Sequence, residues 1–305
     1  MADMSRRRVL MAGVVVLAGA AAVHRAPSVL ADPTDSAEPD PQIEDRLGAL
    51  ERTYNAIIGT HCVDFDTGRN INYRDAELFA VCSTFKAYAA ASVLQKAQRG
   101  QLRLDDEIHI DPGALVENSP VTQPHAGGSL TLAELCRAAL QQSDNTAGNL
   151  LLRAIGGPPA IADFARQVGD DVTRLDRWET DLNSAVPGDP RDTSTPHMIG
   201  RGYRNLLTTD VLAPSQRQQL EDWMRGNVTS VMRPGLPPGW TCADKTGSGD
   251  YGSTNDVGMV YGPDGRRVIL SIMTRSRLSD PNTPNLRPLI TEIARFAVPY
   301  VIRQG

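Results

Sequence analysis

The order of strand and helix patterns along the chain constrains the fold most strongly. Short apolar and β-branched stretches that read as strands lie near both ends, at residues 62–65, 71–73, 240–245, 256–261 and 267–274. Helical periodicity fills the long stretch between them, and a periodic segment also stands outside the strands at each end, at residues 43–57 and 286–301. This order predicts an α+β fold, in which both termini build one five-stranded antiparallel sheet flanked by terminal helices and an all-helical part is inserted between them.

The same pattern predicts two domains. Residues 42–80 and 226–305 are expected to form the sheet domain, and residues 81–225 the helical domain. A cleft is expected where the helical part meets the sheet, because ligand sites commonly form between packed units.

The first 41 residues are not expected to belong to either domain. Ser5-Arg6-Arg7-Arg8 precedes an apolar run over residues 9–23 and a small-residue exit at residues 29–31. This pattern is typical of a cleaved signal of the twin-arginine export route, and an uncleaved anchor is the alternative. Residues 32–41, which are polar and rich in proline, predict a flexible tether. The mature protein is therefore expected to be periplasmic or secreted, with no stable membrane anchor.

Charge and metal-ligating residues exclude some classes of function. Removal of residues 1–31, whose net charge is +3, changes the net charge of the chain from −5 to about −8. An acidic chain without a basic run argues against a nucleic-acid partner. The four cysteines show no C-x-x-C spacing, so buried free thiols are favoured over a metal cluster, although disulfides stay open: Cys62, Cys82, Cys136 and Cys242. Four histidines lack ligand spacing and are interpreted as structural or surface residues: His61, His109, His125 and His197. We expect neither a metal nor a cofactor.

The first candidate catalytic pair is Ser83 and Lys86, in the stretch Cys-Ser-Thr-Phe-Lys. A serine hydroxyl is a weak nucleophile and needs a nearby base. Residues i and i+3 share one face of a helix, so the two side chains are expected to point into the same space. A spacing this simple also occurs by chance, so it needs support from other stretches.

Two later stretches supply that support. Ser143-Asp144-Asn145 offers a second hydroxyl that could relay a proton and an amide that could bind a substrate amide, although the same residues are also good helix caps. Lys245-Thr246-Gly247 offers a cation and a hydroxyl for a carboxylate, and a glycine that permits close approach to the backbone. The alternative for this stretch is a strand that ends in a glycine-rich loop.

Lysine usage favours the catalytic interpretation. The chain has three lysines against 28 arginines, and two of the three are Lys86 and Lys245. Arginine stays charged at any relevant pH, whereas a buried lysine can lose its proton and act as a base.

Together these stretches resemble the class A serine β-lactamases. The three motifs match that family in order and spacing. A fourth match is the stretch at residues 174–183, which is similar to the start of the family's Ω-loop. Arg191-Asp192-Thr193 is similar to the end of that loop, so the loop is expected at residues 174–192. The resemblance covers residues 43–301.

The resemblance implies a role for each catalytic residue. Ser83 would open the β-lactam ring to an acyl-enzyme, with its own N–H and that of Ser248 as the oxyanion hole. Lys86 and Glu179 are both candidate bases for acylation. Ser143 would pass a proton to the β-lactam nitrogen. Glu179, with Asn183, would activate the water that hydrolyses the ester.

The resemblance also implies the residues that bind substrate. Asn145 would meet the side-chain amide of the substrate, while Lys245, Thr246, Gly247 and Ser248 would line the site, with Thr246 and Ser248 on the ring carboxylate. The arginine that relatives place near this carboxylate is missing, and Arg275 is the candidate replacement. An ion pair between Arg177 and Asp192 would clamp the Ω-loop.

The expected function is therefore hydrolysis of β-lactams, acting on a small-molecule substrate as a monomer. Two alternatives stay open, a penicillin-binding DD-peptidase and a β-lactam-binding sensor that does not hydrolyse. Glu179 and Asn183 argue against the first alternative. Cys82 precedes the serine as in some carbapenem-hydrolysing relatives, but Gly249 stands where its disulfide partner is usual, so carbapenem hydrolysis is not predicted.

Overall fold

The computed structural model describes residues 40–303. The predicted leader at residues 1–31 and most of the predicted tether at residues 32–41 lie outside the described residues. Asp40 and Pro41, the end of that tether, instead begin the first helix, α1 (Pro41–Tyr54), because the Asp40 side chain accepts a hydrogen bond from the N–H of Gln42 and caps it.

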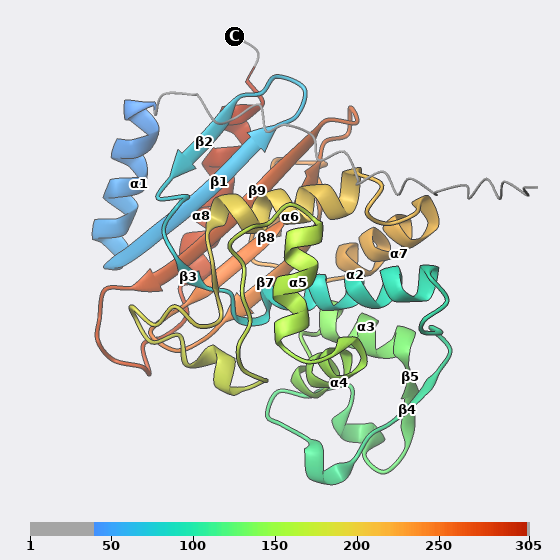
Figure 1. Ribbon diagram of the computed structural model, residues 1–305. Helices are drawn as coiled ribbons and strands as arrows, with labels where there is room; N and C mark the ends of the chain where they lie inside the picture. The colour runs from blue at the N-terminus through green and yellow to red at the C-terminus, as the bar shows by residue number, and fades with distance from the viewer. Residues whose placement is uncertain (1–39, 304–305) are drawn as a thin grey trace, which may run out of the picture.

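The sheet is five-stranded and antiparallel, with the order β2-β1-β9-β8-β7. Its strands are β1 (Ala56–Asp64), β2 (Asn70–Tyr73), β7 (Thr241–Ser248), β8 (Thr254–Tyr261) and β9 (Arg267–Ser276). Strand β1 pairs along its whole length with β9, so the two ends of the chain meet in the middle of the sheet (Figure 1). This arrangement confirms the predicted fold class.

One boundary in the sheet differs from the prediction. The sequence placed Ile57 on a helical face, but α1 ends at Tyr54 and Ile57 lies in β1. The cause is Asn55, which adopts a left-handed conformation with φ 47° and so ends the helix, because asparagine tolerates this region better than most residues.

Helices cover both faces of the sheet. Helices α1 and α8 (Arg287–Val301) pack on one face, where Leu47, Ile293 and Leu270 belong to one buried apolar cluster. Helix α6 (Pro196–Thr208) packs on the other face against β1, β8 and β9 (Figure 1). Each face of the sheet is thereby removed from water.

The helical part surrounds α2 (Phe85–Gln98), which packs against the other helices nearby: α3 (Leu132–Gln141), α4 (Asn145–Ile155), α5 (Pro159–Gln167) and α7 (Pro214–Arg225). Helix α2 is buried from Phe85 to Gln95. Its many alanines allow neighbours to approach from all sides, which explains why it shows little amphipathic pattern.

Two short strand pairs were not predicted. Strand β3 (Phe79–Ala80) pairs with β6 (Thr193–Ser194), and β4 (Glu107–His109) pairs with β5 (Ser129–Thr131). The pair β3–β6 matters for the site, because β3 leads into Ser83 and β6 follows the predicted Ω-loop. The predicted domain boundaries at residues 80/81 and 225/226 stay a prediction.

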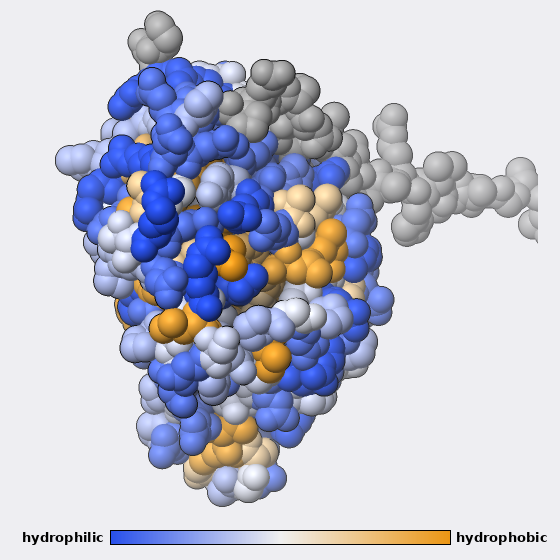
Figure 2. Space-filling model, turned by 90° about the vertical axis from the view of Figure 1, so that its left-hand side faces the viewer, coloured by the Kyte–Doolittle hydropathy of each residue, from blue (hydrophilic) through white to orange (hydrophobic). Residues whose placement is uncertain are grey.

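Within residues 40–303, no helix combines the length and the apolar character needed to cross a membrane. On the face shown in Figure 2, hydrophobic residues occur in separate patches among hydrophilic ones. All four cysteines are buried free thiols, as the sequence favoured.

Candidate active site

Ser83 and Lys86 lie at the junction between the sheet and the helical part. Ser83 sits in a single 3₁₀ turn (Cys82–Thr84) that leads directly into α2, and Lys86 lies in the first turn of α2. Lys86 Nζ is 2.8 Å from Ser83 Oγ. The predicted pair therefore meets, and the helix N-terminus adds backbone N–H groups beside the serine.

Lys86 is fully buried among oxygen acceptors. Its Nζ lies 2.9 Å from the Ser143 carbonyl, 2.6 Å from Asn145 Oδ1 and 2.9 Å from Glu179 Oε1. Burial lowers the pKa of Lys86 from its usual value, and the Glu179 carboxylate opposes this shift. The lysine is thereby placed where it can exchange a proton with the serine.

Gly148 on α4 makes room for the Lys86 side chain. A Cβ at Gly148 would lie 2.8 Å from Lys86 Cε, which is closer than carbon atoms can approach. The absence of a side chain at this position lets α4 pack directly on the aliphatic part of Lys86.

The Ser143-Asp144-Asn145 stretch caps a helix and also lines a surface cleft. Asp144 caps α4 by accepting from the N–H of Ala147, and it also accepts from the N–H groups of Val121 and Thr122. Its neighbours Ser143 and Asn145 turn toward the site. Ser143 is held at φ 57°, a left-handed conformation that is rare outside glycine and typical of functional sites.

Lys245 reaches the same group of residues from the sheet. Its Nζ lies 3.0 Å from Ser143 Oγ and 2.8 Å from the Thr246 carbonyl. Burial, and secondly the charge of Lys86, lower the pKa of Lys245 to about 7. A lysine in this state can donate a proton to Ser143 near neutral pH.

Gly247 permits close packing between two segments of the protein, and not only the approach of a ligand. A Cβ there would lie 2.8 Å from the Val81 carbonyl and 3.2 Å from Cys82 Cβ. The glycine thus lets β7 pack against the segment that carries Ser83. Gly249 is similar, since a Cβ there would lie 2.9 Å from Cys82 Sγ.

Glu179 is buried and contacts the nucleophile directly. Ser83 Oγ donates to Glu179 Oε1 at 3.1 Å, and Asn183 Nδ2 donates to Oε2 at 2.5 Å. Asn149 on α4 holds the backbone of Glu179 from both sides, accepting from its N–H and donating to its carbonyl, each at 2.9 Å. Sequence reasoning missed Asn149, although it lies four residues after Asn145 and therefore on the same face of α4.

An ion pair closes the loop that carries Glu179. Arg177 Nε lies 2.6 Å from Asp192 Oδ2, and Asp192 Oδ1 accepts from the N–H groups of Asp176 and Arg177. Asp192 is fully buried. The predicted partners of the loop clamp therefore meet.

A surface cleft lies over these residues. It is lined by Ser83, Asn118, Gln142, Ser143, Asn145, Asn183, Thr229, Thr246, Gly247, Ser248 and Arg287. Arg275 does not line it; this residue lies on β9 opposite Ile57 of β1. Arg287, at the start of α8, reaches the cleft instead and donates to the Thr229 carbonyl at 3.0 Å. No local sequence pattern pointed to Arg287, because α8 is remote in the chain from the three motifs.

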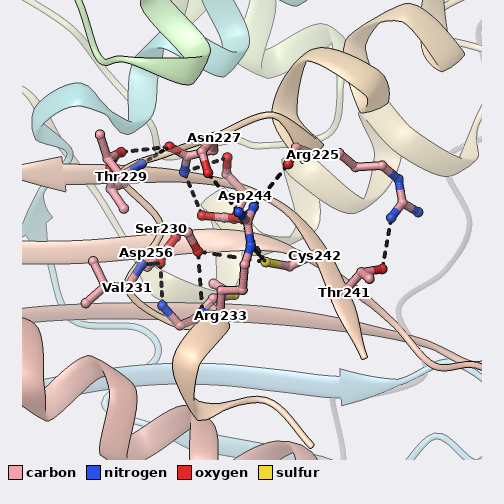
Figure 3. A network of polar contacts seen from close by, with 12 residues as sticks. Arg225, Asn227, Thr229, Ser230, Val231, Arg233, Thr241, Cys242, Asp244 and Asp256 are labelled. Atoms are coloured by element: carbon pink, nitrogen blue, oxygen red, sulfur yellow. Dashed lines mark hydrogen bonds and ion pairs between the residues drawn. The ribbon is translucent and has the colours of Figure 1, made fainter. Parts of the chain in front are cut away.

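A polar network supports the far end of β7 (Figure 3). Arg233 donates to the Asn227 carbonyl and to Asp244 Oδ1, and Asn227 Nδ2 donates to Asp244 Oδ2. Asp256 Oδ2 accepts from the N–H groups of Val231 and Met232. Arg233 therefore holds the network together at this end of β7.

The surroundings of Asp256 disfavour its charged form. Burial, and secondly the Asp244 carboxylate, raise the pKa of Asp256 well above its usual value. Asp256 Oδ1 receives no hydrogen bond from residues 40–303, so nothing at this oxygen stabilises the charged form of the carboxylate.

Comparison with known proteins agrees with the geometry. Residues 42–301 match the model of the beta-lactamase enzyme family. A β-lactamase of Amycolatopsis lactamdurans is 43% identical over 262 residues, which are 85% of each chain, and β-lactamase CTX-M-8 of Citrobacter amalonaticus is 43% identical over 75% of this chain and 79% of its own.

Solved structures give the same result. A β-lactamase from Desulfarculus baarsii superposes with a TM-score of 0.82 at 39% identity, over 86% of this chain and 98% of that one. A variant of the last common ancestor of Gram-negative class A β-lactamases superposes with a TM-score of 0.81 at 42% identity, over 86% and 99% of the two chains.

Proposed function

The chain belongs to the class A β-lactamase family, and from this membership we propose a serine acyl-enzyme mechanism for its hydrolysis of β-lactams. The family favours hydrolysis over the two alternatives of a DD-peptidase and a sensor. Each step below is argued from the contacts around Ser83.

Acylation begins at the Ser83 hydroxyl, which attacks the carbonyl carbon of the β-lactam. Two groups lie within hydrogen-bond distance of Ser83 Oγ to take its proton, Lys86 at 2.8 Å and Glu179 at 3.1 Å. The backbone N–H groups of Ser83 and Ser248 stabilise the negative charge that develops on the carbonyl oxygen.

Ser143 delivers the proton to the leaving nitrogen. Its hydroxyl lies 3.0 Å from Lys245 Nζ, and its carbonyl lies 2.9 Å from Lys86 Nζ. A proton can therefore pass from Lys245 through the Ser143 hydroxyl to the ring nitrogen while the C–N bond of the β-lactam breaks, and the contact of Lys86 with the Ser143 carbonyl holds that residue in place.

Deacylation depends on Glu179. Once acylated, Ser83 Oγ has no proton, so it can no longer donate to Glu179 Oε1. That oxygen then accepts from a water molecule instead and draws off its proton as the water attacks the ester. Asn183, which donates to Oε2, orients the carboxylate.

Substrate is bound along β7. Thr246, Ser248 and Arg287 line the same cleft as the nucleophile, and together they offer two hydroxyls and a guanidinium to the substrate carboxylate. Asn145 meets the substrate's side-chain amide. We also propose that the protein is exported by the twin-arginine route and acts as a monomer in the periplasm or outside the cell. The proposed export route rests on the leader sequence.

The direct contact between Glu179 and Ser83 carries this proposal, and Glu179→Ala tests it. We expect the variant to acylate but to lose roughly 10³-fold in turnover, about 4 kcal/mol of barrier lowering, because no base activates the water. Mass spectrometry after mixing with benzylpenicillin should show a persistent adduct on Ser83.

The matched control is Asp181→Ala, which removes an exposed carboxylate from the same loop. It should turn over normally. Rapid turnover by Glu179→Ala would contradict the deacylation step, and failure of the wild-type protein to destroy benzylpenicillin would contradict the function itself.

A further inference from the structure

Three metal-ligating side chains converge at a place that the catalytic mechanism does not use. His61 lies on β1, Asp75 follows β2, and His197 lies in the first turn of α6. One ligating atom from each residue lies within 4.8 Å of the others. These residues are widely separated in the chain, which is why their spacing predicted only structural or surface histidines.

The distances suit a small divalent cation. His197 Nδ1 lies 3.3 Å from Asp75 Oδ2, and His61 Nδ1 lies 3.9 Å from the same oxygen. In a tetrahedral zinc site, bonds of 2.0–2.2 Å place neighbouring ligand atoms about 3.3 Å apart. Of the three pairs of ligating atoms, His197–Asp75 already has this separation, His61–Asp75 needs a shift of roughly half an ångström, and the two histidine nitrogens lie within 4.8 Å of each other.

The surroundings supply a fourth ligand atom and a route by which a metal ion can enter. Asn72, directly opposite His61 on β2, places Oδ1 2.8 Å from His61 Nδ1. The His61 side chain is buried, whereas those of Asp75 and His197 are 22% and 15% exposed, so the cluster opens to the surface on one side. Arg74, next to Asp75, directs its guanidinium to Glu51 and Glu77.

We propose that His61, Asp75 and His197 form a structural zinc site. Two imidazole nitrogens and one carboxylate oxygen are a ligand set that Zn²⁺ accepts, with Asn72 Oδ1 or solvent in the fourth position. Binding through His61 Nδ1 uses the tautomer that carries its proton on Nε2, because a ligating nitrogen must present a lone pair to the metal, and Asn72 Oδ1 then faces the metal and not an N–H group.

The position of the cluster predicts its effect. The segment after Asp75 continues through β3 to Ser83, and His197 follows β6, which pairs with β3. A metal ion there joins the sheet, the segment entering the active site and α6. The cluster lies outside the residues that line the catalytic cleft. Zinc should therefore stabilise the fold and leave the chemistry of hydrolysis unchanged.

The test uses the full chain without a histidine tag, stripped of metal with EDTA and then titrated with ZnCl₂. Calorimetry should show one zinc per chain, and Tm should rise by about 5 °C at a zinc concentration of 100 times Kd. Co²⁺ should give the intense visible absorption of a tetrahedral site.

Two variants and a control identify the ligands. His197→Gln and Asp75→Asn should each weaken zinc binding by roughly 100-fold and abolish the rise in Tm. The control His125→Gln, which removes an exposed histidine elsewhere, should bind zinc as the wild type does. Two ligand variants are needed because one of them could unfold.

The proposal fails if the wild-type protein binds no zinc, or if both ligand variants bind it as tightly as the control does. Hydrolysis of nitrocefin at saturating zinc should stay within about twofold of the metal-free rate. A large change in that rate would place the metal in the catalytic cleft and overturn the assignment.

Discussion

At the scale of single residues, the site depends on small groups as much as on catalytic ones. Gly148 leaves space for the Lys86 side chain, and Gly247 lets β7 approach the segment that carries Ser83. The position of a catalytic group therefore depends partly on neighbouring residues that have no side chain. Sequence motifs record the catalytic residues but not these packing requirements.

The arginine that binds the substrate carboxylate is a prediction at this scale. Arg287→Ala should raise the Michaelis constant for a penicillin roughly tenfold, because a charge-assisted hydrogen bond is worth about 1.5 kcal/mol. The matched variant Arg275→Ala should leave it unchanged, because Arg275 lies outside the cleft. Steady-state kinetics of both variants check the prediction, and the reverse result would restore Arg275 as the carboxylate ligand.

The residues of the site were predictable to different degrees. Ser83, Lys86, Ser143, Glu179 and Lys245 were named from sequence, and the structure brings them together. Their chemistry is local to short motifs, so a sequence can reveal it. Asn149 and Arg287 were missed because their roles arise only when α4 and α8 pack beside those motifs.

At the scale of elements, the segment at residues 174–192 carries Glu179, the residue to which we assign deacylation. Its ends are joined by the ion pair between Arg177 and Asp192, and its middle is held by Asn149. The loop has little regular structure, with a single 3₁₀ turn at Asp181–Ser184. Its shape therefore depends on a few polar contacts.

Asp192→Ala should loosen this loop. The change leaves Arg177 and two backbone N–H groups without their buried acceptor, which should cost about 3 kcal/mol of unfolding free energy. Turnover should fall more than acylation, since Glu179 lies on the loop. Urea denaturation and burst kinetics measure the two effects.

Asp189→Ala is the control, because it breaks the Arg191–Asp189 ion pair in the same loop, where the Arg191 side chain is 52% exposed. Asp189→Ala should lower the free energy of unfolding by less than about 1 kcal/mol. Equal losses in the two variants would mean that the clamp contributes no more than a surface pair.

Elements were predicted well where local pattern decided them. The five strands of the sheet were expected from their short apolar and β-branched stretches. The placement of Ile57 was wrong, because a helix stop at Asn55 outweighed an apolar spacing that continued past it. The pairs β3–β6 and β4–β5 were missed because two or three residues carry no periodic signal.

At the scale of the whole molecule, the raised pKa of Asp256 links stability to pH. An acid whose native pKa is raised holds its proton after the unfolded chain has lost it. The unfolded state then binds fewer protons, so stability falls as pH rises from about 4 toward the native pKa of Asp256. The slope is up to about 1.4 kcal/mol per pH unit.

Asp256→Asn should remove this part of the pH dependence. An asparagine can accept from the N–H groups of Val231 and Met232 and donate to Asp244, so the network survives without a titrating group. Unfolding free energies between pH 4 and 7 should decline less in the variant than in the wild type. Asp163→Asn, on the surface of α5, is the control, and parallel curves for the wild type and Asp256→Asn would contradict the raised pKa of Asp256.

The pairing of β1 with β9 has a consequence for biosynthesis. While the ribosome is still making the C-terminal third of the protein, the β1–β2 hairpin has already been synthesised. The edge of β1 that will pair with β9 is still unpaired at that stage. The sheet can close only after β9 has been translated, so the nascent chain must stay soluble until synthesis is almost finished. The twin-arginine route that we propose would carry this protein after its sheet has closed.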